Sequence, residues 1–148
     1  MSLKSTINED LKQYMKDKDT YALEAIRMLK SEIKYVEIEQ KGELDDNGII
    51  KVLQSTIKKN KEAVEIYEKA GRIDLRDKEK RYNEVLAKYM PEQLDNAKIK
   101  EIIHSVIDEM GVNTNFGAVM KASMLKIGSR AEGKTVSALV KEVIDGSN

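Results

Sequence analysis

The chain has 148 residues, in which 26 Lys and Arg side chains balance 26 Asp and Glu side chains. A net charge of zero excludes a uniformly basic nucleic-acid-binding protein, so any contact with nucleic acid needs a local basic patch. The sequence contains no cysteine, which excludes disulfides and thiolate chemistry. It shows no signal peptide and no apolar run of the ~18 residues that a membrane span needs, so we expect a soluble, cytoplasmic protein.

In the first 90 residues, apolar side chains recur three and four positions apart, which predicts long amphipathic helices. Asp19 is placed to cap the second helix, and Asp45 or Asp46 to cap the third. We expect Gly42 to take the left-handed conformation that ends the second helix, because glycine adopts it without a steric penalty. The expected helices cover approximately residues 3–15, 20–41, 46–70 and 74–89.

Pro91 marks the one clear boundary, because the residue before a proline avoids the helical conformation. Beyond it the expected helices are shorter. Asp95 or Asn96 begins the first of them, and Thr135 is placed to cap the last. These helices cover approximately residues 96–110, 116–124 and 136–144.

The change at Pro91 predicts two domains. Residues 1–90 carry 19 basic and 18 acidic side chains, and residues 91–148 carry 7 and 8, so a basic patch in either half must be local. Strand signals with a period of two are missing from the whole chain. The sequence therefore predicts an all-α protein with a long-helix N-terminal domain, residues 1–90, and a small C-terminal helical bundle, residues 91–148.

The stretch from Gly128 to Thr135, GSRAEGKT, matches the phosphate-binding P-loop pattern of nucleotide hydrolases. A working P-loop follows a buried strand, whereas the residues before Gly128 have helical spacing. Only 13 residues follow Thr135, too few for the remaining strands of a nucleotide-binding domain. We therefore interpret the stretch as a glycine-rich turn that leads into a capped helix.

The same stretch lies in a locally basic segment, since five bases and one acid, Glu132, fall between Val112 and Lys141. Such a surface suits the phosphates of a nucleic acid, and a glycine lets the backbone approach a partner closely. The alternative is a solvated charged face whose glycines only turn the chain. The candidate RNA-binding residues are Lys121, Lys126, Arg130, Gly133 and Lys134.

No other motif predicts a catalytic, cofactor or metal site. His104 is the sole histidine and sits beside the apolar stripe of its helix, where a partly exposed structural role is expected. The loop from Glu43 to Ile50 is similar to half of a calcium-binding loop, but Gln54 stands where a bidentate carboxylate is needed. The tyrosines fall in helical stretches, where we expect packing between helices rather than stacking on bases.

Five short stretches, in order and suitably spaced, resemble the YqeY family over nearly the whole chain. They are AIRMLKS at 25–31, KAGRIDL at 69–75, YMPEQL at 89–94, FGAVM at 116–120 and RAEG at 130–133. The later part is similar to the tail domain of the B subunit of glutamyl/aspartyl-tRNA amidotransferase. The family pattern near the end is Gly-Arg-Ala-Asp-Gly, from which Ser129 and Glu132 depart.

The resemblance implies two helical domains and a link to the transamidation of misacylated tRNA, in which the tail domain holds tRNA. The glutaminase and kinase parts of such an enzyme have no counterpart here, so a carbon–nitrogen ligase label would describe association and not chemistry. We expect a non-catalytic adaptor that binds or associates with tRNA, with an amidotransferase or another translation-related protein as a possible partner. The alternative is a protein–protein interaction module that uses the N-terminal helices and has no RNA role.

Overall fold

The computed structural model describes residues 2–112 and 114–146. These residues form seven α-helices and one 3-10 turn, with no strand among them, which confirms the all-α class. The helices group into two compact units divided between Met90 and Pro91, which we call unit 1 and unit 2. The helices are α1 (Leu3–Asp17), α2 (Thr20–Gln40), α3 (Asp46–Lys69), α4 (Ile73–Ala87), α5 (Asn96–Met110), α6 (Phe116–Ile127) and α7 (Gly133–Gly146), and the 3-10 turn is η1 (Gly128–Arg130).

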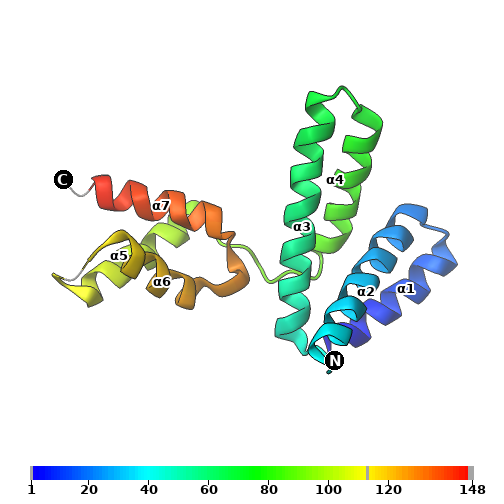
Figure 1. Cartoon of the computed structure of the whole chain (residues 1–148), viewed down its shortest axis with the longest axis horizontal. Helices are drawn as coiled ribbons and strands as arrows, with labels where there is room; N and C mark the ends of the chain where they lie inside the picture. The colour runs from blue at the N-terminus through cyan, green and yellow to red at the C-terminus, as the bar shows by residue number, and fades with distance from the viewer. Residues whose placement is uncertain (1, 113, 147–148) are drawn as a thin grey trace. The chain divides into compact units, whose positions relative to one another are not determined.

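Unit 1 consists of two helical hairpins, α1–α2 and α3–α4 (Figure 1). Helix α4 packs against both α2 and α3 and so joins the hairpins. Their shared core comes from apolar stripes that the sequence displays at helical spacing. Its fully buried members include Ile7, Ile26, Leu29, Ile49, Leu53 and Leu86.

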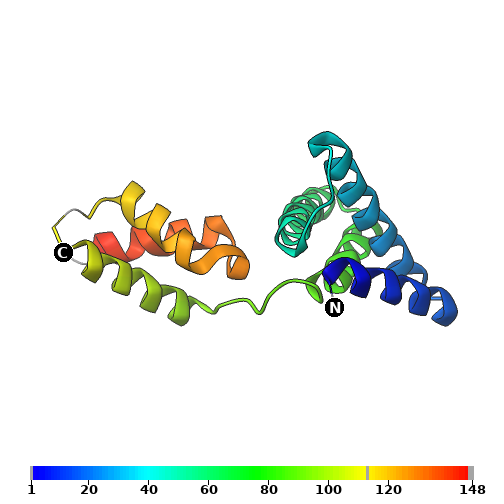
Figure 2. The same cartoon turned by 90° about the horizontal axis from the view of Figure 1, so that it is seen from below.

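Unit 2 is a bundle of three helices in which α5, α6 and α7 pack on one another (Figure 2). Each helix contributes one apolar face to a second core, separate from that of unit 1. The fully buried members are Ile99, Ile103, Val106, Val119, Ile127, Val136 and Val140.

Three aspartates begin helices as the sequence predicts. Asp19, Asp45 and Asp95 each accept a hydrogen bond from a backbone N–H three residues ahead, at 3.1, 2.8 and 2.8 Å. The choice between Asp45 and Asp46 is thereby resolved, and Asp46 instead accepts a hydrogen bond from the Leu3 N–H at 2.9 Å. The expected capped turn at Asp45 is confirmed.

Three boundary predictions differ from the structure by one to three residues: the left-handed residue after α2, the start of α7 and the end of α4. The left-handed residue after α2 is Lys41, with φ of 57°, because the Gly42 N–H bonds back to the Glu37 carbonyl and forces the residue between to turn. Helix α7 begins at Gly133, and Thr135 lies in its first turn, because the Val136 N–H bonds to the Glu132 carbonyl. Helix α4 ends at Ala87, since tighter three-residue bonds close the chain up to Met90.

Polar bonds join the helices of unit 1 at its margins. The Tyr82 hydroxyl donates to Glu24 of α2, and the Tyr89 hydroxyl donates to Asp10 of α1 at 2.5 Å. Burial and the neighbouring Asp10 carboxylate raise the pKa of Tyr89. These two tyrosines pack as expected, whereas the prediction fails for Tyr35, whose side chain is 61% exposed on α2.

Candidate nucleic-acid interface

The GSRAEGKT stretch forms the connection between α6 and α7. Gly128–Arg130 is the 3-10 turn, Ala131 is extended and buried, and α7 begins at Gly133. A helix, and not a strand, precedes this turn, so the backbone lacks the strand–loop–helix arrangement of a P-loop. The match to the nucleotide-binding pattern is therefore accidental.

The chain segment that follows Pro91 holds this turn in place. The Leu94 N–H donates to the Arg130 carbonyl at 2.8 Å, and Gln93 Nε2 donates to the Ser129 carbonyl at 3.1 Å. Gln93 Nε2 also donates to the Pro91 carbonyl at 2.8 Å. Two of the stretches that carry the family resemblance, YMPEQL and RAEG, therefore meet at the turn.

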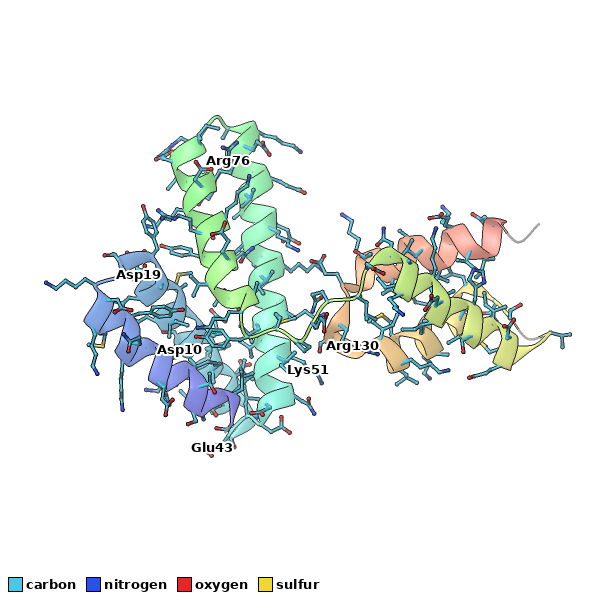
Figure 3. All side chains as sticks on the ribbon, turned by 180° about the vertical axis from the view of Figure 1, so that it is seen from behind. Asp10, Asp19, Glu43, Lys51, Arg76 and Arg130 are labelled. Atoms are coloured by element: carbon cyan, nitrogen blue, oxygen red, sulfur yellow. The ribbon has the colours of Figure 1, made fainter. Side chains whose placement is uncertain are left out.

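The Arg130 side chain caps the end of α6 (Figure 3). Its Nε donates to the Ile127 carbonyl at 3.1 Å, and its Nη2 donates to the Lys126 carbonyl at 2.7 Å. These carbonyls belong to the last turn of α6, which has no intrahelical donors for them. Two of the three guanidinium nitrogens thus have a structural role, and Nη1 makes no hydrogen bond to any described residue.

Lys126 is also engaged within the unit. Its Nζ lies 2.9 Å from Glu109 Oε1, which forms an exposed ion pair between α6 and α5. Exposed pairs of this kind contribute about 0–1 kcal/mol to stability, so the contact is weak but does neutralise the charge locally. A phosphate at this position would have to compete with Glu109.

Lys121 and Lys134 remain available to a partner. Both residues are exposed, and neither forms an ion pair or hydrogen bond with another described residue. Lys121 lies in the middle of α6 and Lys134 in the first turn of α7, so one precedes and one follows the turn at Gly128–Arg130 in the chain. Leu125, one helical turn after Lys121, is 79% exposed, so this surface also has an exposed apolar side chain.

Gly133 has open space in front of its backbone. A Cβ added at this position would have no described atom within 4 Å, and its φ lies outside the left-handed region. The fold itself therefore does not require glycine at 133. The space is compatible with the close approach of a partner.

Of the five sequence-predicted residues, the structure leaves Lys121, Lys134 and Gly133 accessible and assigns Arg130 and Lys126 to contacts inside the unit. Sequence reasoning missed Gln93 and Leu94, because their partners lie 36 residues further along the chain. Only a pattern linking the two segments across many sequences could have revealed this contact.

The remaining candidates lie elsewhere. His104 is exposed on α5. The described residues contain no group of three or more His, Asp or Glu side chains placed to hold a metal ion. None of the helices in the described part of the chain is long and apolar enough to cross a membrane.

Comparison with known proteins identifies relatives over most of the chain. An uncharacterised protein of Schizosaccharomyces pombe is 32% identical over 95 residues, which cover 64% of this chain and 77% of the relative. The Pyrenophora tritici-repentis protein named "Altered inheritance of mitochondria protein 41, mitochondrial" is 29% identical over 142 residues, which cover 93% of this chain and 78% of the relative. The family model described as Yqey-like protein matches residues 4–144, so the chain belongs to the YqeY family.

Proposed function

We propose that this protein is a non-catalytic helical adaptor that binds tRNA through unit 2. The observation that carries the proposal is the pair of exposed lysines, Lys121 and Lys134, on either side of a turn that is held rigid by Leu94 and Gln93. Because the turn is already fixed, its unpaired lysines can contact phosphate oxygens without the entropy cost of ordering a loop on binding. The resemblance of this unit to the tail domain of the tRNA-dependent amidotransferase supports the choice of RNA.

The proposed recognition depends on shape and charge, not on base sequence. Lysine ammonium groups contact phosphates as point charges and carry no base information. Arg130 contributes at most its free Nη1, because its other two nitrogens hold the end of α6. Gly133 lets the RNA backbone approach the start of α7, where N–H groups favour an anion.

The proposal includes a role beside an amidotransferase or another translation-related protein, in the compartment where translation takes place. We propose a cytoplasmic location, although the name of one relative assigns that relative to mitochondria. No chemical step is assigned to the chain.

The test is binding of labelled bulk tRNA at several salt concentrations to the full chain. For wild type we expect log K to fall steeply with log salt, because each neutralised phosphate releases counterions. The Lys121→Ala/Lys134→Ala variant should bind more weakly and reduce the salt slope by about 2, roughly one unit for each lysine.

The matched control is Lys12→Ala/Lys80→Ala, which removes two exposed lysines from α1 and α4 of unit 1. It should retain the wild-type slope. Absence of binding at low salt, or an equal loss of slope in both double variants, would overturn the proposal.

A further inference from the structure

A groove runs between α2 and α3 in unit 1, on residues that the proposed RNA contact does not use. It has two adjoining hollows of about 650 and 350 Å³, which share Glu32 and Thr56 in their walls. Its floor contains the half-buried Val36 and the buried Val52 and Thr56. We call this feature the α2–α3 groove.

Charged side chains follow a definite order along the groove. The smaller hollow has a basic end, and the larger hollow has an acidic end. Between them lie one acidic and then one basic side chain. Figure 3 labels Lys51, the base of the middle, and Glu43, at the acidic end. The order is Arg27 and Lys59, then Glu32, then Lys51, then Glu43 and Asp45.

This order is complementary to its own reverse. Written as signs, it reads two positive, one negative, one positive, two negative, and the reversed series has the opposite sign at every step. A two-fold axis through the middle of the groove would therefore place each charge of one copy over an opposite charge of the second. Twofold homodimers require such a self-complementary surface, and opposite charges across an interface fix its register.

Two exposed apolar side chains lie on one side of α2, and one of them lines the groove. Met28 lines the smaller hollow and is 43% exposed, and Tyr35, seven residues later on the same side of α2, is 61% exposed. Aromatic residues and methionine are enriched in protein interfaces. Burial of these two side chains supplies the attraction, and the charge order supplies the orientation.

The loop at the acidic end is anchored to α1. Glu37 accepts hydrogen bonds from Lys4 Nζ at 2.6 Å and from the Leu44 N–H at 2.9 Å, which anchors the loop between α2 and α3 to α1. Glu43, in this loop, has a side chain that is 90% exposed and lies 3.9 Å from Lys4 Nζ. Such a preordered end lowers the entropy cost of association.

From this surface we propose that the α2–α3 groove is the interface of a homodimer, in which two chains pair antiparallel so that the basic end of each meets the acidic end of the other. This inference uses residues different from Lys121 and Lys134. Either proposal can therefore fail while the other stands.

The first test is sedimentation velocity of the full chain at low salt, from low micromolar to several hundred micromolar concentration. We expect a concentration-dependent shift from monomer to dimer. Arg27→Glu/Lys59→Glu makes both ends acidic and should weaken the dimer at least about tenfold, because like charges then face each other. Lys12→Glu/Lys80→Glu, with the same change of net charge on α1 and α4, should dimerise as wild type does.

The decisive test is a mixture of two variants. Glu43→Lys/Asn47→Lys makes the second end basic without removing the Asp45 cap, and it should also fail to dimerise alone. Mixed with Arg27→Glu/Lys59→Glu, it should form a heterodimer, because opposite charges then meet at both ends. Circular dichroism checks that each variant is folded.

A wild type that stays monomeric over the whole range would overturn the proposal. Dimers that survive both charge reversals, or folded variants that do not associate when mixed, would do the same. Met28→Ser/Tyr35→Ser, which keeps all the charges, should also weaken the dimer. Unchanged dimerisation of this variant would contradict the role of the apolar pair.

Discussion

Arg130 fits two interpretations of the sequence, one as an RNA contact and one as a structural residue. As a base in a basic segment it is a candidate RNA contact, yet in the structure its guanidinium bonds two backbone carbonyls at the end of α6. A charged donor on an otherwise unpaired helix-end carbonyl is stabilising. Any loss of the proposed RNA binding in an Arg130 variant would therefore come partly from loss of structure.

Substitution of Arg130 by alanine should destabilise unit 2 by about 1 kcal/mol, since two partly exposed hydrogen bonds to carbonyls are lost. For a unit of this size such a loss lowers the melting temperature by roughly 4–8 °C. Thermal denaturation followed by circular dichroism measures it. Lys121→Ala, at an exposed position without a partner, should change stability by less than about 0.5 kcal/mol. Equal stability of the two variants would refute the capping role.

At the scale of elements, α4 joins the two hairpins of unit 1, and it contains a carboxyl group with one oxygen that forms no hydrogen bond in the described structure. Glu79 is half-buried in α4, its Oε2 has no hydrogen-bond partner, and burial raises the pKa of its carboxyl group. A carboxyl whose pKa is higher in the folded state stabilises the fold when protonated. That stability is fully present below the ordinary pKa of 4.5 and is lost as pH rises through the folded value.

Glu79→Gln should therefore raise the free energy of unfolding of unit 1 at pH 7, by at most about 1 kcal/mol, because it removes a partly desolvated charge that the nearby Lys78 offsets only in part. It should also reduce the fall in the free energy of unfolding that the wild type shows as pH rises above 4.5. Urea denaturation at several pH values measures both effects. Glu84→Gln, an exposed neighbour on α4, is the control and should change neither. A less stable Glu79→Gln at pH 7 would contradict this account.

At the scale of the whole molecule, the two units have separate hydrophobic cores, and the described core of each is made only from its own helices. Each core buries whole apolar faces of three or more helices, which is the requirement for independent folding. The Gln93 and Leu94 contacts lie inside residues 91–148, so a fragment that begins at Pro91 keeps the pinned turn.

We therefore expect residues 91–148, expressed alone, to be helical and to unfold cooperatively. Residues 1–90 should do the same, since Tyr89 and its bond to Asp10 lie within them. Circular dichroism melts of both fragments and of the full chain test this expectation. A fragment without cooperative melting would show that its unit depends on the other.

The sequence by itself determined the all-α class and the cap at Asp19, because apolar spacing and side-chain capping act within a few residues of one another. It narrowed the caps of α3 and α5 to two adjacent residues each, and the structure selected Asp45 and Asp95. It also excluded a P-loop, since no strand pattern precedes Gly128. The left-handed Lys41 escaped prediction because a backbone bond between Glu37 and Gly42, not glycine preference, sets that helix end.

All four charged side chains of the candidate site are exposed, and only the structure shows which of them are engaged in contacts within unit 2. Lys126 and Arg130 are engaged because α5 and the end of α6 bring Glu109 and two carbonyls to them, whereas Lys121 and Lys134 meet no such group. The contact between Leu94 and Arg130 and the charge order of the α2–α3 groove have the same origin. The Arg130 bonds reach carbonyls only three and four residues earlier in the chain. The other features join residues far apart in the chain, and their proximity depends on helix packing, which local sequence patterns do not encode.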